Sequence, residues 1–62
     1  MIRVNSSSIR AVGFDGNHLF VQFHTSEKIY DHPGVPYSVF VELMDADSKG
    51  GYYNRYIRGR YC

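Results

Sequence analysis

The chain has 62 residues, of which 44% are hydrophobic and 16% aromatic, and its formal net charge is +1. This length allows one domain with one core and excludes a deep enclosed active site, because so short a chain buries only about 60% of the surface that it exposes when unfolded. The hydrophobic and aromatic content excludes an intrinsically disordered chain.

Charge is distributed unevenly along the chain. Residues 1–47 carry three basic and six acidic side chains, a net charge of −3, whereas residues 48–62 carry four basic side chains and no acid, a net charge of +4. The positive charge is therefore confined to the C-terminal segment.

Nothing in the sequence indicates export or a membrane. Cys62 is the only cysteine and cannot form an internal disulfide, so there is no sign of an oxidising compartment. Residues 1–10 lack the apolar run of a signal peptide, and no segment approaches the roughly 20 apolar residues of a membrane-spanning helix. We therefore expect a cytoplasmic protein with no membrane partner.

Three strands are predicted in the first half of the chain. Their segments are residues 9–15 (IRAVGFD), 18–24 (HLFVQFH) and 28–32 (KIYDH). The second segment alternates apolar residues with the period of a half-buried strand. The sequence DGN at residues 15–17 predicts a tight turn between the first two strands, since Gly16 accepts a positive φ at little cost. Residues 1–5 are expected to form a frayed arm.

An amphipathic helix is predicted to cover the sheet. Within residues 35–46 (VPYSVFVELMDA), one broad apolar stripe recurs at helical spacing, formed by Val39, Phe40, Leu43 and Met44. Pro36 fits the first turn, where its missing N–H is not needed. A second, shorter helix is expected over residues 49–58, with Ser48 as its N-cap and Gly59 at its end.

The predicted fold is thus α+β: a three-stranded antiparallel β-meander packed by one amphipathic helix and followed by a short C-terminal helix. Residues 1–62 are expected to form a single domain. Within the second helix, Tyr53 and Ile57 are four residues apart and are expected to face the core, whereas Arg55 and Arg58 are expected to face solvent.

The order of these segments resembles the KTSC domain, a family named for its occurrence at the C-terminus of some lysyl-tRNA synthetases and otherwise found mostly in short bacterial and phage proteins. The resemblance covers residues 6–61. Its most specific residues are Val35 and Pro36, followed by Ser48, Gly50, Tyr53, Asn54, Ile57 and Arg58. The resemblance implies a small α+β domain, and it implies RNA binding only as a proposal made for the family, to which no catalytic residues are assigned.

Two features depart from the pattern of the family. The tyrosine-any-tyrosine motif of the family reads Tyr30-Asp31-His32 here, so a histidine replaces the second tyrosine. The second hairpin contains HTSEK, where relatives have a tighter glycine turn. Any function of the second tyrosine therefore does not carry over to His32 by resemblance alone.

Neither catalysis nor metal binding is predicted. The three histidines, His18, His24 and His32, lie at a turn and at strand ends without a nucleophile and an orienting third group, so we interpret them as surface or edge-strand residues. His24 and His32 are candidates to face each other across the second hairpin, with Cys62 as a further ligand only if the tail folds back. Two histidines are too few for a zinc site. We expect no catalytic residue, no metal and no cofactor.

Two surfaces are candidate binding sites. The first is a basic C-terminal face suited to phosphates and bases, formed by Lys49, Arg55, Arg58, Arg60 and Tyr61. The second is the strand face opposite the first helix, formed by Phe20, Gln22 and His24, with Arg10 nearby. This strand face is either a contact platform or is covered by the second helix or a partner subunit.

Two functions follow as alternatives. The first is a non-catalytic binding module that makes auxiliary contacts to RNA or another nucleic acid through the basic C-terminal face. The second is a phage-type accessory or inhibitor protein that binds a host protein or sequesters a small phosphorylated ligand such as a nucleotide, with a homo-oligomer as one form.

Overall fold

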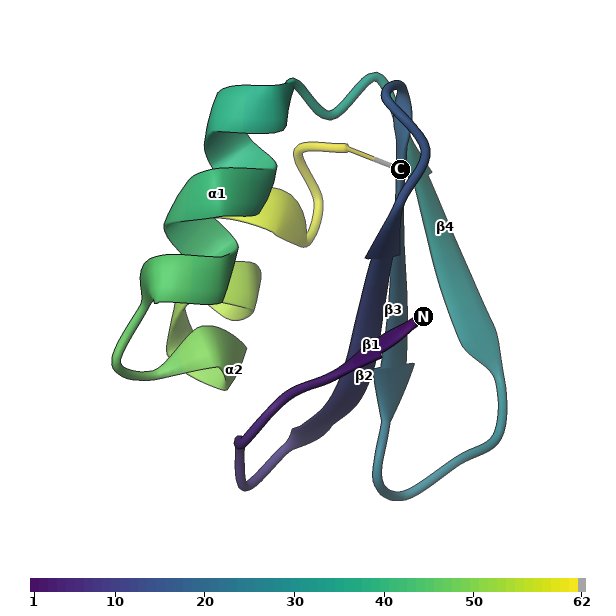
Figure 1. Ribbon diagram of the computed structural model, residues 1–62, viewed down its shortest axis with the longest axis vertical. Coiled ribbons are helices and arrows are strands. Elements are labelled where there is room, and N and C mark those ends of the chain that lie inside the picture. The colour runs from purple at the N-terminus through teal and green to yellow at the C-terminus, as the bar shows by residue number, and fades with distance from the viewer. Residues whose placement is uncertain (62) are drawn as a thin grey trace.

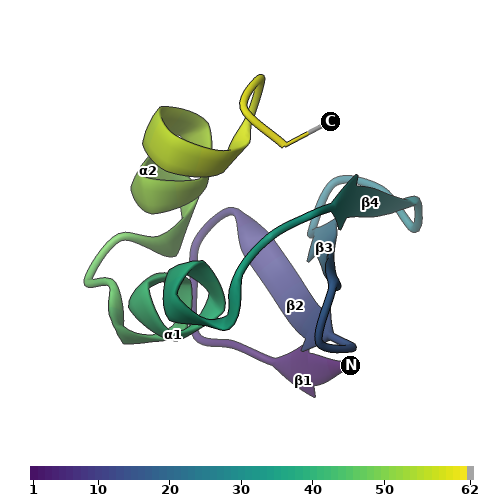
Figure 2. The same ribbon diagram turned by 90° about the horizontal axis from the view of Figure 1, so that it is seen from above.

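The computed structural model describes residues 1–61, which form a four-stranded antiparallel sheet with two helical segments on one face (Figure 1, Figure 2). The strands are β1 Ile2–Arg3, β2 Ile9–Phe14, β3 His18–Phe23 and β4 Ile29–Pro33, in this order across the sheet. The helical segments are α1 Tyr37–Asp45, and α2 Lys49–Tyr52 followed by a π-helical turn, η1 Tyr53–Ile57. None of the helices described here has the length and apolar character needed to cross a membrane.

Strand β1 corrects the prediction of a three-stranded sheet with a frayed arm. Ile2 pairs with Val12 and Arg3 with Ala11, and the N–H of Val4 donates to the carbonyl oxygen of Arg10 at 3.0 Å. The physical reason is that the outer edge of β2 offers unpaired backbone groups, which the first residues of the chain satisfy. The α+β architecture itself is as expected.

The predicted turn between β2 and β3 is confirmed. A carboxylate oxygen of Asp15 accepts hydrogen bonds from the N–H groups of Asn17, at 3.0 Å, and His18, at 2.7 Å. Gly16 has a φ of 100°, which a residue with a side chain adopts only at a cost. This turn sets the register in which Val12 faces Val21.

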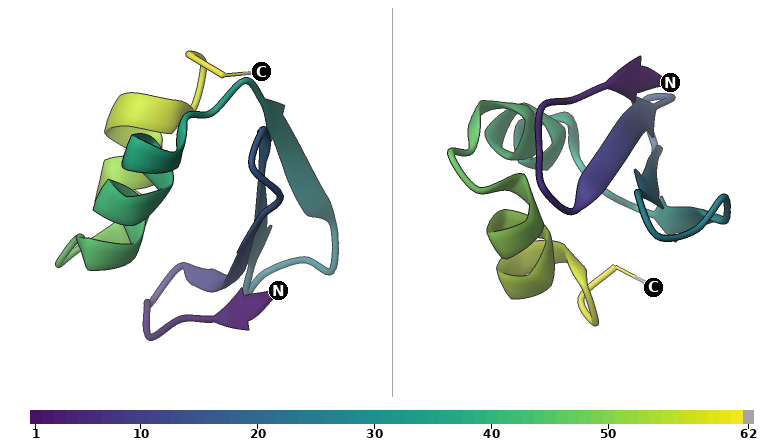
Figure 3. Two further views of the ribbon diagram at one scale, coloured as in Figure 1. Left: turned by 45° about the horizontal axis from the view of Figure 1, so that its top comes forward. Right: turned by 90° about the horizontal axis from the view of Figure 1, so that it is seen from below.

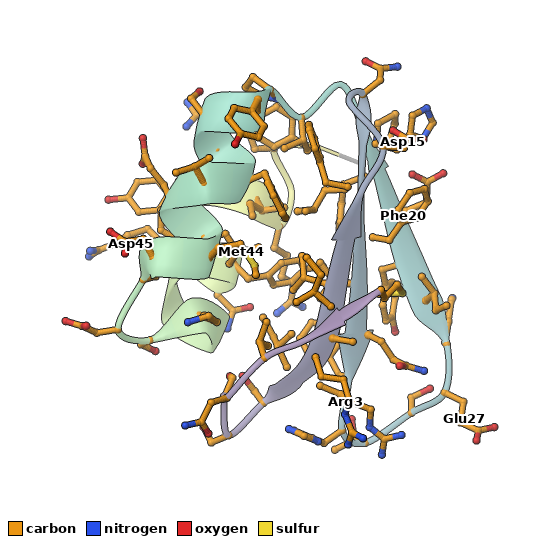
Figure 4. The ribbon with its side chains drawn as sticks, viewed as in Figure 1. Arg3, Asp15, Phe20, Glu27, Met44 and Asp45 are labelled. Atoms are coloured by element: carbon orange, nitrogen blue, oxygen red, sulfur yellow. The ribbon has the colours of Figure 1, made fainter. Side chains whose placement is uncertain are left out.

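The core lies between the sheet and the helical segments, both of which pack on the same side (Figure 3). The apolar stripe predicted for α1 is confirmed: Leu43 is fully buried, and Val39, Phe40 and Met44 pack against the core. Met44 lies between α1 and the sheet, whereas Asp45 lies on the far side of the helix (Figure 4).

The second helix begins as predicted but changes type. The side chain of Ser48 accepts a hydrogen bond from the N–H of Gly51 at 3.2 Å, which confirms it as the N-cap. After one turn, the N–H of Arg58 donates to the carbonyl oxygen of Tyr53 at 2.8 Å, an i to i+5 bond that widens the last turn. Gly59, with a φ of 79°, then ends the helix as expected.

Gly50 allows α2 to approach the segment before β2. A Cβ atom at position 50 would lie 2.1 Å from the hydroxyl oxygen of Ser8, closer than any van der Waals contact. Replacing glycine by alanine inside a helix usually stabilises it by about 1 kcal/mol. Here we expect Gly50→Ala to give little of this gain, because the exposed hydroxyl of Ser8 must rotate away and the added methyl group still lies 3.3 Å from the Cβ of Ser8.

Urea unfolding measures this effect, and a second substitution isolates its cause. In a Ser8→Ala background the hydroxyl oxygen is gone, so Gly50→Ala should recover more of the expected gain. The full gain of about 1 kcal/mol on Gly50→Ala alone would show that the contact with Ser8 does not oppose the substitution.

Candidate nucleic-acid interface

The C-terminal segment separates its apolar and basic side chains. Tyr53 and Ile57 are 6% and 0% exposed and belong to the core, as predicted. Arg55, Arg58 and Arg60 are exposed. The basic face therefore surrounds a short helical segment whose inward side chains are already used in packing.

Lys49 and Tyr61, the other two predicted members of the basic face, also have structural contacts. The amine of Lys49 donates to the carbonyl oxygen of Ala46 at 3.1 Å, at the C-terminal end of α1, where a positive charge is favourable. The ring of Tyr61 packs against the core, and its carbonyl oxygen accepts a hydrogen bond from His32. The three arginines are therefore better placed than these two residues to contact a phosphate.

Arg55 borders a shallow hollow of 390 Å³, called here the Arg55 hollow. Its lining residues are Ala46, Ser48, Gly51, Tyr52, Arg55 and Tyr56. The hydroxyl of Tyr52 donates to a carboxylate oxygen of Glu42 at 2.9 Å. Burial, together with this hydrogen bond, raises the pKa of Tyr52 to about 12. The neighbouring carboxylate makes this hollow less favourable for an anion.

Arg58 borders a second hollow of 330 Å³, called here the Arg58 hollow, whose lining residues are Phe23, Tyr30, Tyr53, Asn54 and Arg58. The ring of Phe23 meets those of Tyr30 and Tyr53 edge-on, with centroids 5.7 and 5.2 Å away. Burial raises the pKa of Tyr53, and the nearby charge of Arg58 acts in the opposite direction. No carboxylate lines this hollow.

His32 contacts Tyr53, one of the residues that line the Arg58 hollow, and does not have the surface position expected for it. It is on an edge strand, β4, but its side chain faces the core and is only 7% exposed. Its Nδ1 bonds to the carbonyl oxygen of Tyr61, and its Nε2 lies 2.8 Å from the hydroxyl oxygen of Tyr53. Because a carbonyl only accepts, Nδ1 carries the proton in the bond to Tyr61, and Nε2 and the Tyr53 hydroxyl share the second hydrogen bond.

The face of the sheet away from the helices carries Phe20, as predicted (Figure 4). Its ring lies nearly parallel to that of His18, with 6.1 Å between the centroids. The alternative in which the second helix covers this face is wrong, because α2 and η1 pack on the opposite face (Figure 3). Phe20 is half-buried by its neighbours on the sheet.

The other predicted members of this strand face are engaged in local contacts. The side-chain amide of Gln22 donates to the carbonyl oxygen of Glu27 at 3.0 Å and so ties down the second hairpin. His24 lies just beyond β3, with its Nε2 2.9 Å from the carbonyl oxygen of Ser6. The register of β2 against β3 shifts by one residue at Arg10, which lies between the paired residues Ile9 and Ala11 and has no partner on β3. Gln22, His24 and Arg10 therefore do not form a single binding surface with Phe20.

The comparison with known families bears directly on the resemblance. The KTSC domain matches residues 5–61. The chain belongs to the KTSC domain family. The crystal structure of a KTSC domain protein from Yersinia pestis is similar to this chain, with a TM-score of 0.89 and 34% sequence identity, and the match covers 97% of this chain and 86% of that one. A search of curated proteins gave no match.

In this KTSC domain, two parts of the sequence that are far apart meet at the Arg58 hollow. Tyr30 comes from β4, whereas Tyr53, Asn54 and Arg58 come from η1 and its end. Sequence reasoning proposed Arg58 but missed Tyr30 and Asn54 as site residues. Two weak signals pointed to them: Tyr30 and His32 lie two apart on one strand face, and Asn54 lies four residues before Arg58 on one side of a helix.

The metal arrangement considered for the histidines is wrong. His32 lies opposite Leu19 in the sheet, whereas His24 lies beyond the opposite end of β3, so the two rings do not face each other. Within residues 1–61, no three His, Cys, Asp or Glu side chains are grouped as a metal site requires. Cys62, the third ligand considered, lies outside the described residues.

We expect the exposed pair of His18 and Asp31 to make a small, pH-dependent contribution to stability. The Nδ1 of His18 lies 2.8 Å from a carboxylate oxygen of Asp31, and this hydrogen bond raises the pKa of His18 above its ordinary value of 6.5. The stabilisation is therefore complete below pH 6.5 and is lost as the pH rises through the raised pKa.

We expect the thermal midpoint of the wild type to exceed that of the Asp31→Asn variant by more at pH 6 than at pH 8. Thermal unfolding followed by circular dichroism checks this difference. Equal pH dependence in the two proteins would mean that the pair does not contribute.

Proposed function

We propose that this KTSC domain is a non-catalytic module that contacts single-stranded RNA or a similar nucleic acid through its basic C-terminal face. The observation that carries the proposal is the arrangement of Arg55 and Arg58, each exposed beside a hollow lined by tyrosines. Guanidinium groups bind phosphates, and tyrosine rings stack on bases. The only ion pair among residues 1–61 joins His18 and Asp31, so no carboxylate there neutralises these arginines.

The number of basic side chains sets the strength of this binding. With three arginines each contacting one phosphate of a single strand, the logarithm of the affinity should fall with the logarithm of the salt concentration with a slope of about −2. Such a slope belongs to an auxiliary contact that adds to a larger interface. A protein that binds nucleic acid tightly and sequence-specifically is expected to show a steeper dependence on salt.

Fluorescence anisotropy with a labelled single-stranded RNA, titrated at several salt concentrations, tests the proposal. Arg58→Ala should weaken binding about tenfold at low salt, because it removes a charge-assisted contact, and should reduce the slope by about 0.7. Arg3→Ala is the charge-matched control, since Arg3 is exposed on β1 at the far edge of the sheet from β4. Equal losses in the two variants, or no binding by the wild type, would contradict the proposal.

A second candidate function is contact with another protein or a second copy of this chain. Large apolar side chains are exposed around the seam between β1 and α1, with exposures of 53% for Ile2, 67% for Tyr37 and 42% for Val41. Two hollows of 610 Å³ each border this seam and share Ile2, Tyr37 and Phe40. Light scattering distinguishes a second copy from another partner, and a monomer at high concentration would remove the homo-oligomer.

A further inference from the structure

The Arg58 hollow combines side chains that recognise different parts of a nucleotide. Phe23, Tyr30 and Tyr53 supply aromatic surface, Asn54 supplies an amide, and Arg58 supplies a guanidinium group. Its volume of 330 Å³ lies at the lower end of the range for small-ligand sites, which is about 300–1,000 Å³. A hollow of this size has room for one planar ring system and not for a folded element of a partner.

Tyr30 is the aromatic ring of this hollow that is best placed to stack on a ligand. It is 38% exposed, whereas Tyr53 is 6% exposed and is held by its hydrogen bond to His32. The amine of Lys28 lies over the Tyr30 ring, 4.9 Å from its centroid, so a base that stacks on this face takes the place of the amine. A second cation therefore stands at the rim of the hollow, in addition to Arg58, and both are suited to the phosphates that flank a base.

Asn54 adds a group that can distinguish bases. Its side chain is exposed, lines the hollow and comes from the same turn as Arg58. An amide presents both a donor and an acceptor, which match the hydrogen-bonding edge of a nucleobase. A free phosphate or a simple carboxylate would need neither this amide nor the aromatic rings.

The chemistry of the two hollows favours this one for a nucleotide. The hydroxyl of Tyr52 in the Arg55 hollow is bound to the carboxylate of Glu42, and that negative charge opposes a phosphate. The residues that line the Arg58 hollow include no acid. Arg55 can contact a neighbouring phosphate of the same strand without a base entering its own hollow.

We propose that the Arg58 hollow binds one unstacked nucleobase of a single strand, with the ring on Tyr30, the base edge at Asn54 and the adjoining phosphates at Arg58 and Lys28. This inference rests on the proposed function, because it names the part of the same surface that takes a base. It assigns Tyr30, Asn54 and Lys28 to binding, in addition to the predicted arginines.

The test compares a single-stranded oligonucleotide with an abasic one of the same length, built with tetrahydrofuran residues so that all phosphates remain. The wild type should bind the normal strand about tenfold more tightly, because stacking on one aromatic ring contributes roughly this much. Tyr30→Leu should remove that difference and leave binding of the abasic strand unchanged. Asn54→Ala should reduce any preference among the four homopolymers.

Tyr37→Leu is the matched control, since Tyr37 is 67% exposed, lies on α1 and lines neither the Arg55 hollow nor the Arg58 hollow. It should leave the ratio between normal and abasic strands unchanged, and circular dichroism confirms that each variant is folded. Equal binding of both strands by the wild type would overturn the nucleobase site while the proposed function stands. Absence of binding to either strand would overturn the proposed function itself, and this inference with it.

Discussion

Replacing His32 with alanine is expected to lower the free energy of unfolding by about 3 kcal/mol. The substitution leaves two groups without partners, the buried hydroxyl of Tyr53 and the partly buried carbonyl oxygen of Tyr61. Each such group costs about 1–3 kcal/mol, and the missing ring adds a void. A domain of this length has a stability of about 3–9 kcal/mol, so the loss takes away a third or more of it.

Urea unfolding followed by circular dichroism measures the loss at His32, and His24→Ala is the matched control. The ring of His24 also bonds to a carbonyl oxygen, that of Ser6, but the residue is exposed, so water replaces the bond. We expect a change within about 1 kcal/mol for the control. Similar effects of the two substitutions would show that His32 does not join β4 to η1 and the C-terminal residues.

Replacing Ile57 with alanine is expected to lower the free energy of unfolding by about 3 kcal/mol as well. Ile57 is 0% exposed and packs into the core from η1, so the truncation loses buried methyl groups and leaves a cavity. The effect follows from the orientation of the C-terminal segment, because an outward-facing isoleucine would tolerate alanine.

Chemical unfolding of Val41→Ala gives the comparison for Ile57. Val41 is also an aliphatic side chain on a helix but is 42% exposed, so the change in stability should stay within about 0.5 kcal/mol. A small effect at Ile57 would contradict the placement of η1 against the sheet and with it the position of the arginines.

The sequence predicts those parts of the fold that depend only on residues close together in the chain. Alternation along β3, the turn at Gly16 and the stripe on α1 each require only neighbouring residues, and all three are present. Strand β1 has two residues, too few for any period to be seen, and it forms because the edge of β2 offers it backbone partners. The π-helical bond of Arg58 likewise follows from packing, since propensity does not separate it from an α-helical turn.

The candidate site divides in the same way. Arg55 and Arg58 were predicted from the charge of residues 48–62, which needs no tertiary structure. Tyr30 was not, because its place beside Arg58 depends on how β4 lies against η1. His32 is the clearest case: the sequence shows a histidine in place of a tyrosine, and only the folded chain shows that both ring nitrogens are used in holding that junction.

The location of RNA contacts on this KTSC domain tests the central claim most directly. Two-dimensional ¹H–¹⁵N NMR spectra, recorded while a single-stranded RNA is added at low salt, report which amides change. The proposed interface predicts shifts at Tyr30, Asn54, Arg55 and Arg58, with little change at Phe20 on the opposite face of the sheet. Shifts centred on Phe20, or none at any RNA concentration, would contradict it.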